Sequence, residues 1–252
     1  MTILKQSCPH CFAVIGAGGA AGLGTLKVFL EELHDHICAG DCKIVGFEQC
    51  EDVGGIWLPE PHPDPSQTNW PSTPLYDSLR MNVPHPIMFF PSHLAPLSTP
   101  LFTSVHVVND YMQSYVNRFG LRKYIRFNSK ITAATWDSSI NQWRVIYQAT
   151  TSDGPTTKSV AYFNHLLVAN GHYRRPFVLE IKGLQNWASS EARSYIHLIW
   201  YRNLKPYRNQ NVLIVGGGRS RIDISEEIST IAKKTVHSVR SLGDQDFERI
   251  IQ

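Results

Sequence analysis

The apolar positions near the start of the chain predict a strand, a helix and a second strand, in that order. Residues 12–15 form a short apolar run typical of a buried strand. Behind a glycine-rich turn, leucines recur at helical spacing, at Leu23, Leu26, Leu30 and Leu33. Residues 43–47 supply a second apolar run that ends at Glu48. This order predicts a βαβ unit with two parallel strands.

The middle of the chain changes character twice. Between Pro59 and Pro100 lie 11 of the 15 prolines, which exclude long regular elements and predict a long ordered loop or a set of short turns. A helix is expected at about residues 105–119, because apolar side chains recur along one side and Gly120 is placed to end it. That apolar side comprises Val108, Tyr111, Met112, Tyr115 and Phe119.

A period of two follows and indicates three antiparallel strands. Residues 131–136, 142–147 and 159–163 alternate in this way, with turn-forming residues between them. Residues 165–169 then form an apolar run typical of a buried strand, which we expect to return to the first sheet. A connecting region rich in Tyr, Trp and Arg comes next.

The last part of the chain repeats the opening pattern. Residues 211–215 predict a strand, a second glycine-rich turn follows, and a helix carries isoleucines at positions 222, 224, 228 and 231. A further strand is expected at residues 235–239. The fold class is therefore α/β, with a second βαβ unit that begins near the end of the chain and leaves too few residues to finish a sheet.

Composition and charge exclude several classes of protein. The 252 residues allow roughly one to two domains, and 42% apolar with 18% charged residues is ordinary for a chain that buries a core. The formal charge of +3 comes from scattered basic residues, so nucleic acid is not an expected partner. No apolar run approaches the roughly 20 residues that span a bilayer, and the first strand begins too early for a secretory signal. We expect a cytoplasmic protein.

Five cysteines in a chain without a signal indicate reduced thiols. Four of them, Cys8, Cys11, Cys38 and Cys42, precede the two first strands and could gather at one end of a parallel sheet. Their spacing, C-x2-C-x26-C-x3-C, is longer than the zinc-ribbon pattern. We therefore expect no metal site.

The first glycine-rich turn, from Gly16 to Gly22, satisfies the pattern G-x-G-x-x-G/A between a predicted strand and helix. Gly16 permits the tight turn, Gly18 lets backbone approach a pyrophosphate at the helix amino terminus, and Ala21 is small enough for close helix-to-strand packing. Glu48, at the end of the second strand, can accept a hydrogen bond from a ribose hydroxyl. Strand, turn, helix, strand and acid in this order predict a dinucleotide site.

The second glycine-rich turn carries Gly216, Gly218 and Ser220 after an apolar strand. Arg221 takes the sixth position, where Gly or Ala is expected, and should disturb helix packing by about 1 to 3 kcal/mol unless its side chain escapes to the surface. Arg240 ends the following strand, and no acid stands there. An arginine at this place suits the 2′-phosphate of NADP better than the free hydroxyl of NAD, although it is also an ordinary residue for a solvated strand end.

Two nucleotide sites in one chain point to electron transfer between two cofactors, and five segments resemble the flavin-containing monooxygenase family over nearly the whole chain. These are, in order, residues 52–57 (DVGGIW), 76–82 (YDSLRMN), 119–122 (FGLR), 168–173 (VANGHY) and the second glycine turn. The resemblance implies a Rossmann-like FAD-binding domain with an antiparallel β-meander at residues 1–176, a connecting segment at 177–210, and the start of an incomplete Rossmann-like NADP-binding domain at 211–252.

The resemblance also implies roles for residues between the glycine turns. Gly54 and Gly55 would bring backbone close to the flavin nucleotide, and Trp57 would pack nearby. Asn82 matches the asparagine that lies beside the flavin in this family and is thought to help hold the nicotinamide and the reduced-oxygen adduct. From the residues alone, Asn82 would instead cap a turn in the proline-rich loop.

The implied reaction is an oxygenation by FAD and NADPH. NADPH would pass a hydride to the flavin, O2 would add to give a flavin C4a-hydroperoxide, and a soft nitrogen or sulfur atom of a small amine or thioether would attack its outer oxygen. Cofactors supply the hard chemistry in such enzymes, so no acid and base pair of side chains is needed. The sequence contains no G-x-S-x-G, H-E-x-x-H or P-loop motif that would favour another reaction.

The family fingerprint F-x-G-x-x-x-H-x-x-x-Y is kept in part. His197 and Tyr201 are present, whereas Glu191 and Arg193 stand where Phe and Gly belong. A Baeyer–Villiger monooxygenase would usually carry Trp in place of Tyr201, which favours the N- and S-oxygenating branch. Two other readings stay open: an FAD-binding protein or pseudoenzyme without turnover, and a flavin-dependent NADPH oxidase or reductase.

Overall fold

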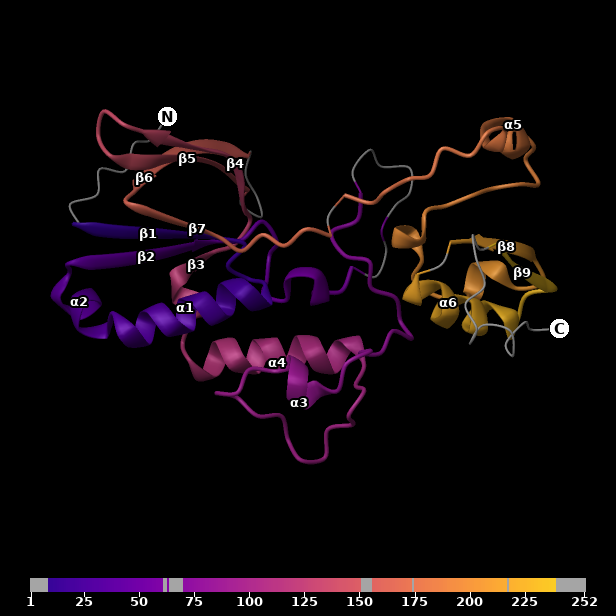
Figure 1. Ribbon diagram of the computed structural model, residues 1–252, viewed down its shortest axis with the longest axis horizontal. Helices are drawn as coiled ribbons and strands as arrows, with labels where there is room; N and C mark the ends of the chain where they lie inside the picture. The colour runs from indigo at the N-terminus through magenta and orange to yellow at the C-terminus, as the bar shows by residue number, and fades with distance from the viewer. Residues whose placement is uncertain are drawn as a thin grey trace. The chain divides into compact units, whose positions relative to one another are not determined.

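The computed structural model describes residues 9–60, 63, 70–150, 156–173, 175–216 and 218–238 (Figure 1). The chain divides into two compact units: unit 1 contains residues 1–75 and 80–201, and unit 2 contains residues 76–79 and 202–252. The assignment of residues 1–176, 177–210 and 211–252 to functional domains stays a prediction.

Unit 1 is built on a parallel sheet of four strands. The strands are β1 (His10–Ile15), β2 (Cys42–Phe47), β3 (Ile125–Arg126) and β7 (His165–Val168), in the order β3-β2-β1-β7. All three pairings are parallel. The predicted βαβ unit and the return of the chain at β7 are therefore present. The sequence did not predict β3, because two residues are too few to show a period.

The helices of unit 1 follow the predicted pattern with one exception. α1 (Ala20–Glu32) and α4 (Val105–Arg118) lie where apolar residues recur at helical spacing. The leucine run ends at Leu33, and a separate helix α2 (His34–Ala39) follows and stops at Gly40, which has a φ of 82°. The shorter elements are α3 (His85–Met88), α5 (Leu184–Ala188), η1 (Gly55–Trp57), η2 (Arg122–Tyr124) and η3 (Leu198–Trp200).

The three strands that the alternating pattern predicted form an antiparallel meander. They are β4 (Ser129–Asp137), β5 (Gln142–Ala149) and β6 (Thr157–Phe163), paired in chain order. The register of β4 against β5 shifts between Ile131 and Ala133, as at a β-bulge. In Figure 1 this sheet and α1 lie on opposite sides of β1 and β2, and α4 runs alongside α1.

The side chains of β1 alternate between two cores, as the period of a strand requires. Cys11 and Ala13 belong to the core that the meander covers, in which Phe47 of β2 meets Phe163 at a ring-centroid distance of 5.8 Å. Val14 belongs to the other core, beneath α1 and α4. The parallel sheet is thus buried on both faces, which is typical of Rossmann-like folds.

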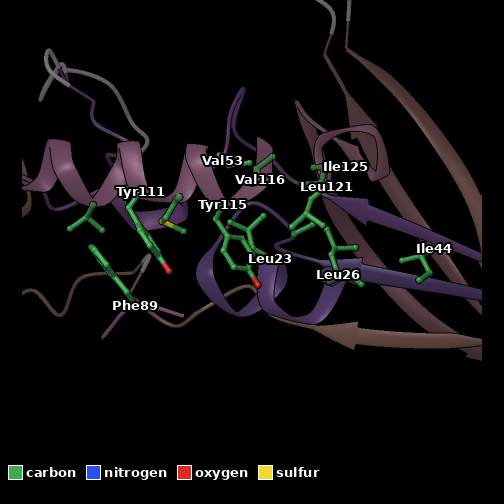
Figure 2. Packing of buried hydrophobic residues seen from close by; sticks show 14 of the residues in the cluster. Leu23, Leu26, Ile44, Val53, Phe89, Tyr111, Tyr115, Val116, Leu121 and Ile125 are labelled. Atoms are coloured by element: carbon green, nitrogen blue, oxygen red, sulfur yellow. The ribbon is translucent and has the colours of Figure 1, made fainter. Parts of the chain in front are cut away.

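The core between α1, α4 and the proline-rich loop is rich in aromatic side chains (Figure 2). Phe89 stacks on Tyr111 with ring centroids 3.7 Å apart and an interplanar angle of 9°, and Tyr115 is fully buried. Each such side chain contributes roughly 1.5 to 3 kcal/mol by leaving water. Phe89 and Phe90 of the proline-rich region are therefore fixed to α4 by their ring contacts with Tyr111 and Tyr115.

The hydrogen bonds around His93 of this loop favour one tautomer of its neutral ring. Its Nε2 lies 2.6 Å from the Ser114 hydroxyl, which donates its single hydrogen to the Tyr111 carbonyl at 2.9 Å. With the hydroxyl hydrogen in this direction, Nε2 is the donor and Nδ1 carries the lone pair. Nδ1 is buried with no hydrogen-bond partner among the described residues. Burial, followed by the charge of Arg118, lowers the pKa of His93.

This lowered pKa makes stability depend on pH. Because the unfolded chain takes up a proton at His93 near its ordinary pKa of 6.5 and the folded chain does not, the free energy of unfolding falls as pH drops below that value, until the folded pKa is reached. We expect the midpoint of thermal unfolding to fall more between about pH 7.5 and 5.5 in the wild type than in His93→Gln. His106→Gln, on the exposed side of α4, is the control. Equal pH dependence in wild type and His93→Gln would contradict the assignment.

Unit 2 contains the second βαβ pattern. β8 (Asn211–Val215) pairs in parallel with β9 (Lys234–Ser238), and α6 (Arg219–Ser229) packs against them through the buried side chains of Ile224 and Ile228. A 3-10 turn η4 (Lys205–Tyr207) precedes β8. The expected strand at 235–239 is thus present one residue earlier. Arg240 lies outside the described residues.

Across the described parts of both units, no helix has the length and apolar character that crossing a membrane requires.

Candidate functional site

Gly16 ends β1 and begins the first glycine turn with a φ of 77°, a conformation that favours glycine. A Cβ on Gly16 would lie 2.7 Å from the Ala169 carbonyl oxygen and 2.7 Å from Asn170 Cα. The backbone of the A-N-G turn after β7 is therefore packed directly against the first glycine turn. The two segments, far apart in sequence, form the same edge of the sheet.

The close contact between helix and turn is made by Gly22. A Cβ on Gly22 would lie 2.3 Å from Gly16 O and 2.6 Å from Ala17 Cα, both backbone atoms. Ala21, which the motif predicts for this role, is exposed instead. The helix begins at Ala20, so the residue that faces the turn comes one position later than the G-x-G-x-x-G/A count. The predicted packing role of Ala21 is therefore wrong and belongs to Gly22.

Glu48 is buried beside the turn, with 4% of its surface exposed. Its Oε2 accepts a hydrogen bond from the Gly18 amide at 2.9 Å, and its Oε1 accepts one from the Cys50 amide at 3.0 Å. A Cβ on Gly18 would lie 2.8 Å from Glu48 Cγ, so the carboxylate and the turn meet closely. Each carboxylate oxygen has a second lone pair that can accept a ligand hydroxyl.

Gly54 and Gly55 close the other side of the turn. The Gly54 amide donates to Gly18 O at 2.8 Å, and a Cβ on Gly55 would lie 3.0 Å from Gly19 Cα. Their φ angles are 138° and 56°, both in the region that favours glycine. Backbone from residues 18–19 and 54–55 thus forms one cradle, and side chains at these positions would fill it.

A polar network anchors this second glycine pair to α4. Asp52 Oδ1 accepts from Arg122 Nη2 at 2.7 Å, and Asp52 Oδ2 accepts from Gln113 Nε2 at 2.9 Å. Arg122 also donates to Gln113 Oε1 at 2.8 Å, and Asn109 donates to the Val53 carbonyl at 3.3 Å. The segments at 52–57 and 119–122 therefore meet in space. Sequence reasoning listed both segments but missed this contact.

The remaining predicted residues of the first site, Trp57 and Asn82, both follow the cradle segment 54–55 in the chain. Trp57 ends η1 and packs, partly buried, against the core beneath α1. Asn82 is exposed, and it follows Met81, whose amide donates to the Thr103 carbonyl at 2.9 Å. The structure places Asn82 at the surface of unit 1 and shows no cap made by its side chain.

In the second glycine turn, the structure describes Gly216 and Gly218. Gly216 has a φ of 131°, and Gly218 is the extended N-cap residue of α6. Ser220 is exposed in the first turn of this helix. Within the described part of unit 2, no side chain caps α6 and no acid lies in its first turn, so its amide groups and its dipole favour an anion.

Arg221 does not escape to the surface. Only 8% of it is exposed, in a place where the motif calls for Gly or Ala. Burial, followed by the charge of Arg221, lowers the pKa of His237 on β9. Of the two outcomes that the sequence left open, the structure selects the buried arginine. The second glycine turn therefore carries a buried positive charge that the first turn lacks.

The chain has a parallel βαβ unit, with a glycine turn after its first strand and a buried acid after its second. A further strand, glycine turn and helix repeat this arrangement. These features define a protein of the Rossmann-like dinucleotide-binding class. Within this class, the chain belongs to the flavin-binding monooxygenase-like family, whose model matches residues 10–251. Monooxygenases are oxidoreductases, and the likeness that five sequence segments indicated is confirmed.

Curated relatives agree with this family. A flavin-containing monooxygenase of Arabidopsis thaliana (FMO GS-OX-like 4) is 31% identical over 95% of this chain and 53% of its own. Rabbit flavin-containing monooxygenase 5 is 31% identical over 90% of this chain and 39% of its own. The chain thus spans about half, or less, of the length of these relatives.

Solved structures show the same fold. The S-allyl-L-cysteine S-oxygenase from Allium sativum is 26% identical with a TM-score of 0.74, over 93% of this chain and 52% of that one. Cyclohexanone monooxygenase in its loose conformation has a TM-score of 0.65 over 96% of this chain and 45% of that one. At 18% identity, the latter likeness concerns the fold alone.

Proposed function

We propose that the first glycine turn of this chain binds FAD and that the second binds NADPH. The observation that carries the first assignment is the buried Glu48 carboxylate at 2.9 Å from the Gly18 amide, beside a cradle of backbone. FAD fits the residues present: the ribose hydroxyls would donate to Glu48, and the pyrophosphate would lie against backbone at Gly18 and the amino terminus of α1. Gly16 and Gly22 would hold the turn in shape.

The amino terminus of α1 supports this placement. Among the described residues, no side chain caps this helix and no acid lies in its first turn. Its first amide groups and its dipole therefore favour a phosphate. Gly54 and Gly55 would let the flavin nucleotide approach the backbone, and Trp57 would pack nearby. Ala21 would contribute through its amide at the exposed start of the helix rather than through packing.

For NADPH, the proposed residues are Gly216, Gly218, Ser220 and Arg240. The uncapped start of α6 offers amide groups to the pyrophosphate, as α1 does. Arg240 would meet the 2′-phosphate. Asn82, which is exposed, would hold the nicotinamide beside the flavin and is the one side chain we place in the reaction itself.

We infer that the protein oxygenates soft nitrogen or sulfur atoms of small molecules. When bound, FAD and NADPH supply hydride transfer and oxygen activation, and the chain supplies orientation and exclusion of water. The relatives support sulfur: the solved structure with a TM-score of 0.74 is that of an S-oxygenase. Tyr201, which is fully buried, stands where Baeyer–Villiger enzymes usually carry Trp, and so favours amine or thioether substrates over ketones.

One observation favours a second candidate, an FAD-binding protein without turnover. Arg221 is buried in the second glycine turn, where close packing of helix on turn requires a small residue. A turn widened by this side chain would bind NADPH poorly. Such a protein would keep its flavin and fail to respond to NADPH.

Product analysis separates these candidates. The protein is supplied with FAD, NADPH and air together with a tertiary amine or a thioether. An N-oxide or sulfoxide formed in proportion to the NADPH consumed supports the monooxygenase. Hydrogen peroxide in place of product would show an NADPH oxidase, and the absence of NADPH consumption despite bound flavin would show the binding protein.

Disrupting the hydrogen-bond network of Asp52 is expected to lower FAD affinity moderately. Asp52→Asn keeps the shape but leaves one carbonyl oxygen where two carboxylate oxygens accept from Arg122 and Gln113. Partly exposed charge networks contribute about 1 kcal/mol, so we expect roughly a fivefold loss of FAD affinity in a flavin titration. Glu31→Gln, which breaks the ion pair with Lys27 on α1, should leave affinity unchanged. Equal effects of both variants would refute the anchoring role of Asp52.

A further inference from the structure

The segment Tyr76–Leu79 is separate in sequence from the rest of unit 2 but belongs to it. Its backbone is fixed there: the Asp77 amide donates to the Arg202 carbonyl at 2.8 Å, and Asn203 Nδ2 donates to Asp77 Oδ2 at 3.3 Å. The residue before the segment, Leu75, is buried in unit 1. Four residues from the proline-rich region thus form part of the second unit.

Two side chains of the segment bind helix α6. The Tyr76 hydroxyl donates to Asp223 Oδ2 at 3.1 Å, and the Ser78 hydroxyl donates to Glu227 Oε2 at 2.7 Å. Asp223 and Glu227 are four residues apart, so both lie on the same face of the helix. Tyr76 is buried, and burial followed by the Asp223 charge raises its pKa, so its phenol keeps the proton that it donates. Bonds to carboxylates are among the stronger hydrogen bonds.

Immediately after the segment, the chain is fixed in unit 1. Arg80 forms an antiparallel bridge with Ser104, and the Met81 amide donates to the Thr103 carbonyl at 2.9 Å. Met81 is buried, and Asn82 is the next residue. Leu79, the last residue of the segment in unit 2, is thus followed directly by Arg80, which is fixed in unit 1. Only two residues separate Leu79 from Asn82.

We propose that the hydrogen bonds Tyr76–Asp223 and Ser78–Glu227 are a clamp that couples helix α6 to the position of Asn82. The proposal rests on the proposed function, because it gives Asn82 its role beside the flavin and α6 its nucleotide. The glycine turn that would bind NADPH forms the start of α6, and the clamp lies one and two turns further along the same helix. Occupancy of the second turn is thereby transmitted to Asn82. Tyr76, Ser78, Asp223 and Glu227 are positioning residues.

The test uses hydrogen exchange of the full chain with and without NADP+. The double variant Tyr76→Phe/Ser78→Ala keeps the size of both side chains and removes both donors. Losing two such bonds should raise exchange about tenfold or more in peptides that cover residues 76–79 and 80–83. In the wild type, NADP+ should protect the start of α6 and also residues 80–83. In the double variant, it should protect α6 alone.

Two further variants define the effect. Tyr195→Phe also removes a phenol in a hydrogen bond, the one accepted from Gln185 at 2.7 Å, and should change neither peptide. Asp223→Asn keeps an oxygen that can accept from Tyr76 and should restore most of the protection that Asp223→Ala loses. The double variant should bind as much FAD as the wild type, but NADPH should reduce its flavin about tenfold more slowly. The NADPH concentration that gives half the maximal rate should change less than the rate itself.

The outcomes are distinguishable. Unchanged exchange at residues 80–83 in the double variant would overturn the clamp, whatever the protein binds. If NADP+ did not protect α6 in the wild type, the proposed second site would be contradicted instead. In that case, comparing exchange at residues 80–83 between the wild type and the double variant without nucleotide would still test whether the clamp holds Asn82. If Tyr195→Phe lost as much protection from hydrogen exchange at residues 80–83 as the double variant, the loss would reflect a general destabilisation of the protein. That result would also overturn the clamp.

Discussion

Replacing Gly22 by alanine is expected to destabilise unit 1 severely and to prevent FAD binding. The new Cβ would lie 2.3 Å from Gly16 O and 2.6 Å from Ala17 Cα, and neither backbone atom can rotate away as a side chain can. Overpacking of this kind costs about 3 kcal/mol. In a chain of this size the midpoint of thermal unfolding should fall by roughly 10 °C. A flavin titration should show an affinity at least about a hundredfold lower.

The matched control is Gly24→Ala on the same helix. A Cβ on Gly24 would meet only the edge of the Phe90 ring, at 3.3 Å, and an aromatic side chain can shift by a few tenths of an ångström. Alanine also favours a helix over glycine by about 1 kcal/mol. Gly24→Ala should therefore unfold within a few degrees of the wild type and keep FAD. If Gly22→Ala behaved like Gly24→Ala, the close contact of helix and turn would be wrong.

Glu48→Gln is expected to produce the second large effect, in FAD affinity. Both carboxylate oxygens of Glu48 accept from backbone amides, Oε2 from Gly18 and Oε1 from Cys50. A glutamine can serve only one of them and turns an NH2 group toward the other. An unsatisfied buried donor costs about 1 to 3 kcal/mol, which corresponds to roughly a 5- to 150-fold loss of FAD affinity.

Glu60→Gln provides the comparison for this result. A single oxygen of Glu60, Oε2, accepts from both the amide and the hydroxyl of Ser72, so a glutamine can keep both bonds. Flavin titration of Glu60→Gln should match the wild type. Wild-type affinity in Glu48→Gln would exclude Glu48 as the acceptor for the ribose and as the support of the turn.

The elements that the sequence predicted are those with a sustained period. The parallel βαβ unit, α4, the meander and the start of the second βαβ unit each repeat an apolar spacing over several residues, and all are present. β3 has two residues and shows no period. α2 was not predicted, because the leucine spacing ends at Leu33, which is the C-cap residue of α1.

The site was predictable only where its residues are neighbours in sequence. The motif placed Gly16 and Gly18 in the turn but assigned the close contact to Ala21, because counting positions does not show that the helix begins at Ala20. Contacts between distant segments gave no signal: 70 residues separate Asp52 from Arg122, and 147 separate Tyr76 from Asp223. The burial of Arg221 depends on packing, so the sequence left both outcomes open.

The measurement that tests the central claim most directly is the visible absorbance spectrum of the purified chain with added FAD, followed by NADPH in the absence of oxygen. We predict that FAD stays with the protein after gel filtration, with a shifted and structured flavin band, and that NADPH bleaches this band. Protein that elutes without flavin, and takes none up at micromolar FAD, would contradict the assignment of the first glycine turn and of Glu48.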